Sequence, residues 1–253
     1  DLTGIRNLKC VIACDGTNFS GFQVQAKGER TVQGVLEETL TKLTGEKIRI
    51  TAAGRTDAKA HAAGQVINFF TSSQIPVSRW AAAFNTNLPA DLVVLEVTEA
   101  SPDFHARYWA RKKTYRYRIH QSRWPDVFLR SYSYHFPFPL EIDRMEKAAG
   151  ILVGRHDFCA FTATGGSSQT TVRNLYRLDL IKEEEEVHFF LEADGFLYKM
   201  ARNIVGTLLL VGTGKITPAE VGEVLLSKDR KKAGPTAPPH GLCLLHVEYG
   251  EGE

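Results

Sequence analysis

The stretch TVQGVLEETLTKL, Thr31 to Leu43, carries apolar side chains at the spacing of one helix face. Those side chains are Val32, Val35, Leu36, Leu40 and Leu43. Thr31 stands just before the first of them and offers the hydroxyl that an N-cap requires. The stretch therefore predicts an amphipathic helix whose apolar face packs on a sheet.

Predicted strands flank this helix on both sides. Residues 8–14 suit a short buried strand, and residues 47–51 and 64–70 alternate between apolar and polar side chains. A second helix is expected over 76–87, with proline near its first turn, and a strand over 92–97. The resulting order, β-α-β-β-α-β, is that of a ferredoxin-like unit.

The second half has similar ingredients. Its expected strands are 113–120, 174–181, 187–193 and 242–249, and its expected helices are 140–152, 199–211 and 218–226. The acidic run 183–186 is interpreted as a solvated hairpin turn. We expect an α+β protein of two ferredoxin-like (RRM-like) halves, 1–105 and 106–253, whose sheets pack into one extended, mostly antiparallel sheet.

Composition limits the possible functions. The chain has 253 residues, 43% of them hydrophobic, and a net charge of only +2, so any nucleic-acid surface must be a local cluster. Its four cysteines lack zinc-site spacing and are expected to be small buried side chains, with no metal. The polar N-terminal residues and the lack of a long apolar run predict a reducing, cytoplasmic location.

The stretch RYWARKKTYRYR, residues 107–118, holds six basic residues, three tyrosines and one tryptophan. Cations neutralise phosphates and aromatic rings stack on bases, so the stretch favours nucleic-acid binding. The alternative is a strand edge that its charges protect from aggregation. The small polar residues of 162–174 suit a surface loop, or one that orders on a polyanion.

The stretch AAGRTDAKAHA, residues 52–62, surrounds one Arg, one Asp and one His with small side chains. Such a setting lets a large ligand approach the Asp57 carboxylate. His61 is interpreted as a structural histidine rather than a metal ligand. Arg202 lies in a mostly apolar helix, where it either extends to solvent or is buried against a carboxylate such as Asp57.

Seven motifs follow one another in an order that resembles the TruA family of tRNA pseudouridine synthases. They are CDGTNFSGFQ (14–23), GRTDAKAHA (54–62), NTNLPADL (85–92), FHARYWARKKTYRYRI (104–119), GRHDFCAF (154–161), FLYKMARNIVGTLL (196–209) and GLCLLHVEY (241–249). The chain departs from the family at Cys14 and Phe22, where Tyr and Trp are common. It has Lys59-Ala60 where the family usually has Gly-Val.

The resemblance implies a pseudouridine synthase fold and an isomerase that converts uridine to pseudouridine in the tRNA anticodon arm, typically at positions 38 to 40. No cofactor is implied, because the reaction only moves the sugar from N1 to C5 of uracil. Family members are homodimers in which one tRNA reaches across both subunits, so a homodimer is implied here too.

The resemblance also implies roles for individual residues. Asp57 matches the catalytic carboxylate, Tyr115 the active-site tyrosine and Arg202 the arginine that pairs with the catalytic Asp. Arg55 matches a residue that assists base flipping, and Leu244 an apolar position near the base. The expected tRNA contacts are Phe104, His105, Ala106, Arg107, Tyr108, Arg123, Gly165, Gly166, Ser167, Ser168 and Gln169.

Two other functions remain open from the sequence. A non-catalytic tRNA-binding module of the same fold would account for the basic, aromatic stretch 107–118 without using Asp57. A glycoside hydrolase would need a second catalytic carboxylate, and no second acidic motif lies in comparable surroundings.

Overall fold

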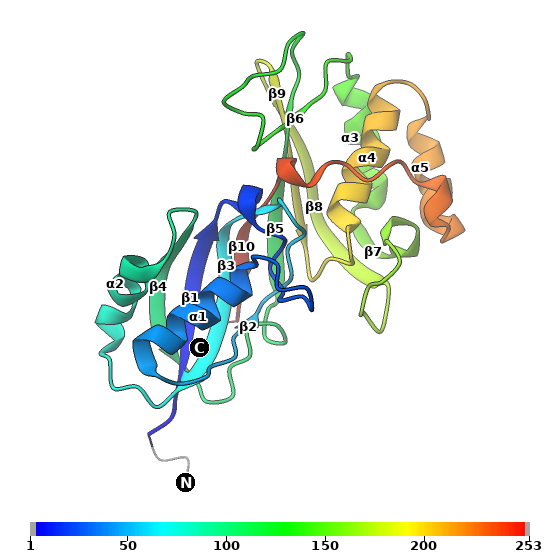
Figure 1. Ribbon diagram of the computed structural model, residues 1–253. Coiled ribbons are helices and arrows are strands. Elements are labelled where there is room, and N and C mark those ends of the chain that lie inside the picture. The colour runs from blue at the N-terminus through cyan, green and yellow to red at the C-terminus, as the bar shows by residue number, and fades with distance from the viewer. Residues whose placement is uncertain (1–3, 251–253) are drawn as a thin grey trace. The chain divides into compact units, whose positions relative to one another are not determined.

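The computed structural model describes residues 4–250, in which the chain forms two compact units (Figure 1). The first unit comprises the chain up to Arg111 and the stretch from Leu244, and the second comprises Lys112–Cys243. Each unit is a mixture of helices and mostly antiparallel strands, which confirms the predicted α+β class. The predicted domains, 1–105 and 106–253, stay a prediction.

The sheet of the first unit has the order β4-β1-β3, with all three strands antiparallel. The bounds of its elements are β1 (Arg6–Cys14), η1 (Gly16–Asn18), α1 (Val32–Thr44), β2 (Thr51–Ala52), β3 (His61–Thr71), α2 (Val77–Asn87) and β4 (Leu92–Ala100). The short β2 pairs with β3, and so does the last strand, β10 (Leu242–Glu248). The order of β4, β1, β3 and β2 is that of the predicted ferredoxin-like unit.

Helix α1 begins as its sequence predicts, and a glycine follows its last turn. The Thr31 hydroxyl accepts the Gly34 amide hydrogen at 3.2 Å, which satisfies one of the unpaired N–H groups of the first turn. The helix ends at Gly45, whose φ of 74° is a left-handed conformation that glycine adopts without strain.

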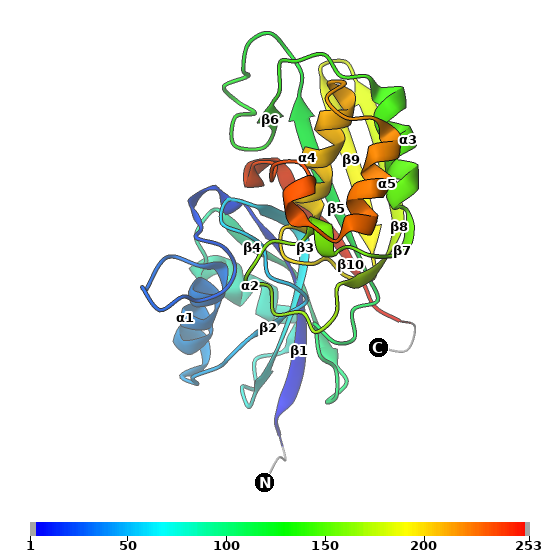
Figure 2. The ribbon, with the colours of Figure 1, turned by 90° about the vertical axis from the view of Figure 1, so that its right-hand side faces the viewer.

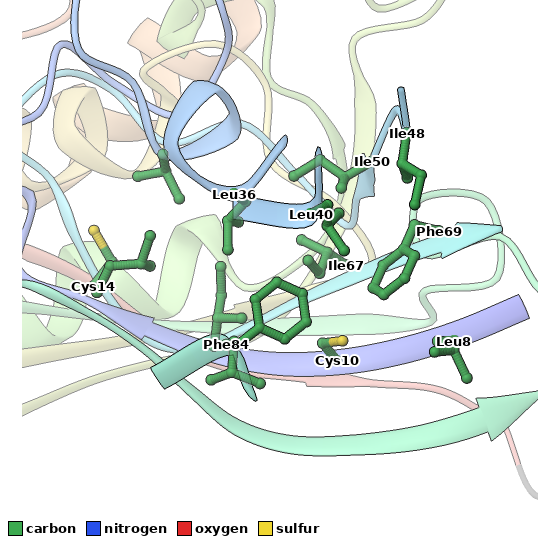
Figure 3. Packing of buried hydrophobic residues seen from close by; sticks show 14 of the residues in the cluster. Leu8, Cys10, Cys14, Leu36, Leu40, Ile48, Ile50, Ile67, Phe69 and Phe84 are labelled. Atoms are coloured by element: carbon green, nitrogen blue, oxygen red, sulfur yellow. The ribbon is translucent and has the colours of Figure 1, made fainter. Parts of the chain in front are cut away.

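The core of the first unit lies between its helices and its sheet. In Figure 3, Leu36 and Leu40 of α1 lie above strand residues that include Cys10 and Phe69. From α2, Trp80 meets the Phe69 ring edge-on at a centroid distance of 5.5 Å. Large aromatic rings packed in this way bury much apolar surface and fix how the helix lies on the sheet.

The strand predicted over 47–51 is largely wrong. Only Thr51 and Ala52 join the sheet, and the preceding residues run beside it without ladder hydrogen bonds. Ile48 and Ile50 are buried in the core whereas Lys47 and Arg49 are exposed. The alternation in the sequence thus arises from packing against the core rather than from strand pairing.

The second unit has the strand order β5-β9-β8-β7, and Figure 2 shows α3, α4 and α5 on one face of its sheet. Its strands are β5 (Lys112–His120), β6 (Tyr134–His135), β7 (Gly154–Asp157), β8 (Val172–Glu183) and β9 (Glu186–Ala193). Its helices are α3 (Ile142–Leu152), η2 (Cys159–Phe161), α4 (Met200–Gly212), α5 (Pro218–Ser227), η3 (Arg230–Lys232) and η4 (Pro239–Gly241). The predicted β8–β9 hairpin around the acidic turn is confirmed.

All four cysteines are thiols, and two differ from the expectation of burial. Cys10 and Cys14 are buried, and burial raises the pKa of the Cys10 thiol far above its ordinary value. Cys159 and Cys243 are only half-buried. Within residues 4–250, none of the helices has the length and apolar character that a membrane crossing requires.

Candidate active site

Asp57 lies in loop 53–60, between β2 and β3, and its side chain is half-buried. The loop is tied to β3 where it begins, because Ala53 N–H donates to Val66 O at 2.9 Å and the Gln65 amide donates to Gly54 O at 2.8 Å. A further bond, from Ala60 N–H to Asp57 O at 3.1 Å, closes the turn after the aspartate. The carboxylate is therefore carried by a fixed backbone of small residues.

A second loop, 15–22, supports the Asp57 loop from another direction. Phe22 N–H donates to Thr56 O at 3.1 Å and Lys59 N–H to Phe19 O at 3.3 Å, so bonds are made on both sides of Asp57. The approach at Gly16 is so close that a β-carbon there would lie 1.9 Å from Ala60 O. The DGTNFSGF motif thus provides glycine where the two loops meet.

Lys59 has a backbone φ of 66°, the left-handed region that favours glycine. This is the position at which the TruA family usually has glycine, so the departure noted in the sequence places strain in the turn after Asp57. Lys59→Gly is expected to raise the free energy of unfolding by about 0.5 kcal/mol, after the greater unfolded-state entropy of glycine is subtracted.

Urea titration measures this change. The matched control is Lys47→Gly, at an exposed lysine that lies outside the left-handed positions, which should lower stability. Equal destabilisation by both substitutions would show that the Lys59 turn carries no strain.

Tyr115 lies on β5 in the second unit, on the buried face of that strand. It is 8% exposed and meets the Phe196 ring edge-on at a centroid distance of 4.8 Å. Tyr117, two residues on, is fully buried and donates its hydroxyl to Pro238 O at 2.7 Å. Burial raises the pKa of Tyr117 well above its ordinary range, although the nearby positive charge of Arg202 opposes this rise.

On the opposite face of β5, several basic side chains are paired with carboxylates, so this face is not an unpaired basic surface. Arg118 donates to Glu186 of β9 through Nε at 3.0 Å, and Lys112 forms an ion pair with Glu192 at 3.3 Å. Thr114 also donates to Glu192. Several polar groups of the 107–118 stretch therefore hold β5 to β9, and its exposed basic residues, Arg107 and Arg111, lie before the strand.

The Arg118–Glu186 pair gives stability a pH dependence. Burial raises the pKa of Glu186, but the hydrogen bonds and charges of Arg118 and His188 outweigh it and the net pKa lies below its ordinary value. This pair's contribution is thus present above the ordinary Glu pKa and is lost as pH falls through the lower folded-state pKa. In urea titrations, Glu186→Gln should have a lower free energy of unfolding than wild type at pH 7, and this difference should shrink below pH 4. A difference of equal size at pH 7 and below pH 4 would contradict the prediction.

Arg202 lies in the first turn of α4 and is 8% exposed. The alternative in which it extends to solvent is therefore wrong. Its Nε donates to Ala237 O at 2.7 Å, and Ala237 N–H donates back to Arg202 O at 3.1 Å. The guanidinium is thus oriented by the segment that follows α5, and its pairing with Asp57 stays a prediction.

A polar cluster that the sequence reasoning missed fixes this segment to α4. The fully buried Asn203 donates to Phe161 O, and its Oδ1 accepts hydrogen bonds from Arg230 at 2.9 Å and Thr236 at 2.6 Å. A polar residue beside Arg202 in an apolar helix was the available signal, because a buried amide needs partners.

The expected RNA-contacting segment 104–108 divides into buried and exposed side chains. Phe104 and Ala106 are buried in the first unit, so they anchor the segment. Arg107 and Tyr108 are exposed, and the His105 ring stacks on Tyr108 at a centroid distance of 4.1 Å. The exposed part therefore combines a cation with stacked rings, the combination that suits single-stranded bases.

The other expected contacts are distributed over both units. Residues 165–169 are all exposed in the loop before β8. Arg123 is exposed and places its guanidinium 5.2 Å from the centre of the exposed Trp124 ring. Leu244 is a buried residue of β10, in the first unit, and Arg55 is exposed two residues before Asp57.

Comparison with known proteins identifies the family. A family model described as tRNA pseudouridine synthase matches residues 11–109 and 148–250. The chain belongs to the tRNA pseudouridine synthase family. A tRNA pseudouridine synthase A of Moorella thermoacetica is 48% identical over 96% of this chain and 99% of its own length. One from Acetivibrio thermocellus is 46% identical over 97% of this chain and all of its own.

The family resemblance seen in the motifs, and the enzyme class of isomerase, are thereby confirmed. In this tRNA pseudouridine synthase, Asp57 and Arg202 lie within the matched ranges. Tyr115 and Arg123 lie between those ranges, although the alignments with both relatives cover nearly the whole chain. The roles of all these residues stay predictions.

Proposed function

We propose that this pseudouridine synthase isomerises uridine in the anticodon arm of tRNA, at positions 38 to 40, with Asp57 as the catalytic carboxylate. The observation that carries the proposal is the setting of Asp57: a half-buried carboxylate on a loop whose backbone is held by hydrogen bonds at Gly54, Thr56 and Ala60. A reacting group fixed in this way needs little reorganisation when the substrate arrives.

The reaction breaks one bond and forms another within the same nucleotide. The bond from C1′ to N1 of uracil breaks, the base turns, and C1′ bonds to C5; the C5 proton leaves and N1 gains one. Cleavage develops positive charge on the sugar, as in glycoside hydrolysis. An ionised Asp57 serves this chemistry by stabilising that charge or by covalent attack.

The target base must leave its stack before Asp57 reaches it. Extrusion of a nucleotide costs a few kcal/mol, which contacts in the flipped state must offset. Arg55 is exposed beside Asp57 and takes the role of holding the vacated position in the RNA. The small side chains of Ala52, Gly54 and Ala58 leave room for the nucleotide.

Two residues of the second unit complete the proposed catalytic group. Tyr115, held edge-on by Phe196, takes the role of contacting uracil and relaying the C5 proton. Arg202, oriented through Nε by Ala237, takes the role of pairing with Asp57, because an opposite charge favours an ionised carboxylate. Arg107, Tyr108, Arg123 and loop 165–169 supply the exposed RNA contacts.

Mapping of the modified nucleotides tests the proposal. A tRNA transcript with uridines at 38, 39 and 40 is incubated with the enzyme, treated with a carbodiimide that marks pseudouridine, and read by primer extension. Stops at one or more of these positions are expected. Stops confined to another arm of the tRNA would contradict the assigned substrate site.

We propose further that the enzyme acts as a homodimer. Support comes from apolar side chains between β5 and α3, where Trp124, Val127, Phe128 and Phe138 are between 61% and 83% exposed. Exposed apolar groups that are close in the chain are typical of protein interfaces. Sedimentation velocity should show a dimer for wild type and a shift toward monomer for Phe128→Ser. A wild-type monomer at micromolar concentration would contradict the proposal.

A further inference from the structure

His61 is the first residue of β3 and lies four residues after Asp57. Its side chain is buried, and its Nδ1 lies 2.9 Å from the backbone nitrogen of Gly16. A backbone N–H can only donate, so Nδ1 accepts and the ring proton of the neutral imidazole is on Nε2. This bond joins the start of β3 to the start of η1, two residues that are 45 positions apart in the sequence.

The bond anchors the loop that supports Asp57. Gly16 begins the short helix η1. The preceding residue, Asp15, caps this helix, because its carboxylate accepts Thr17 N–H at 3.0 Å and the Thr17 hydroxyl at 2.6 Å. The same loop then donates from Phe22 to Thr56 and accepts at Phe19 from Lys59. Its placement therefore determines where the backbone on both sides of Asp57 can lie.

The close approach of Gly16 to Ala60 leaves little room for another arrangement of the two loops. Gly16 approaches Ala60 so closely that no side chain would fit, and Ala60 is the residue between the Asp57 turn and His61. A buried amide that loses its acceptor is costly, so the loop would move to recover a partner. Movement of about 1 Å at a catalytic group is enough to lower a rate about 100-fold.

We propose that His61 is a positioning residue for Asp57: its Nδ1 holds Gly16, and through loop 15–22 it fixes the Asp57 carboxylate in its reactive position. The inference rests on the proposed catalytic role of Asp57. It extends the site to a residue that acts through its hydrogen bond to Gly16.

Three variants separate the acceptor from the ring. His61→Asn keeps an oxygen acceptor at the Nδ1 position, His61→Phe keeps a ring without an acceptor, and His61→Gln moves the acceptor to the Nε2 position. The single-turnover rate and the tRNA dissociation constant are measured for each, with urea titration to establish folding. The Phe and Gln variants should lose about 10- to 100-fold in rate with tRNA affinity within about threefold, and Asn should stay within about threefold in rate.

Hydrogen exchange supplies a readout that does not depend on activity. Exchange of the peptide that covers loop 15–22 should be faster in the Phe and Gln variants and unchanged in Asn. If wild type is inactive but the loop 15–22 peptide exchanges faster in the Phe and Gln variants, the proposed function is contradicted and the anchoring role of His61 is retained. Equal rate loss in the Asn and Phe variants, or a Phe variant with the wild-type rate and exchange, would overturn the inference.

Discussion

Asp57→Asn is expected to lower the single-turnover rate of pseudouridine formation by at least about 10³-fold. Asparagine keeps the size of the side chain, so loop 53–60 has no reason to move, but the charge that stabilises or attacks the sugar is lost. The tRNA dissociation constant should stay within about threefold, because phosphate contacts supply most of the binding free energy. Rate is measured by quenched reaction and affinity by filter binding.

The matched control is Asp103→Asn, which removes the same charge from an exposed position in the same unit. It should change neither quantity by more than about twofold. An Asp57→Asn enzyme that keeps its rate would contradict the catalytic role. Equal losses of rate and of affinity would indicate that Asp57 acts in RNA binding instead.

Gly206→Ala is expected to lower the free energy of unfolding by about 3 kcal/mol. A β-carbon at this position of α4 would lie 1.7 Å from Pro235 O, and backbone rather than a flexible side-chain end would have to move. Displacement of Pro235 also shifts Ala237, whose carbonyl orients Arg202. Activity under conditions where the variant is folded should therefore fall as well.

Gly150→Ala provides the comparison, because a β-carbon added at that position in α3 would meet nothing within 4 Å apart from the adjacent residues and the backbone of its own helix. Alanine favours a helix over glycine, so this variant should gain about 0.5 kcal/mol. Urea titration of both variants measures the difference. A Gly206→Ala protein that unfolds at the wild-type urea concentration would show that the segment around Pro235 yields at little cost.

Elements whose causes are local were predictable from the sequence. The Thr31 cap, the apolar stripe of α1 and the acidic β8–β9 turn each depend on residues within one or two turns of chain. Residues 47–50 show the limit of such reasoning. An alternation of apolar and polar residues occurs in a paired strand, and it also occurs in an unpaired segment that packs every second side chain into a core. Only tertiary structure distinguishes the two cases.

The hydrogen bonds that support the candidate site could not be predicted from the sequence, and the roles of its motif residues stay predictions. Asp57 and Arg202 stand out because their surroundings are unusual for a charge. The bond from Gly16 to His61 and the bonds from Arg230 and Thr236 to Asn203 join residues that are distant in sequence, and periodicity carries no information about such pairs. The pairing of the last strand, β10, with β3 is likewise a contact between residues distant in sequence.

Release of tritium from tRNA labelled at C5 of uracil tests the central claim most directly, because C1′ cannot bond to C5 unless the hydrogen there leaves. Wild type and Asp57→Asn are compared on the same transcript at saturating enzyme. We expect release that matches the pseudouridine formed by wild type, and none above background from the variant. Release from both proteins, or release from neither while the tRNA remains bound, would contradict it.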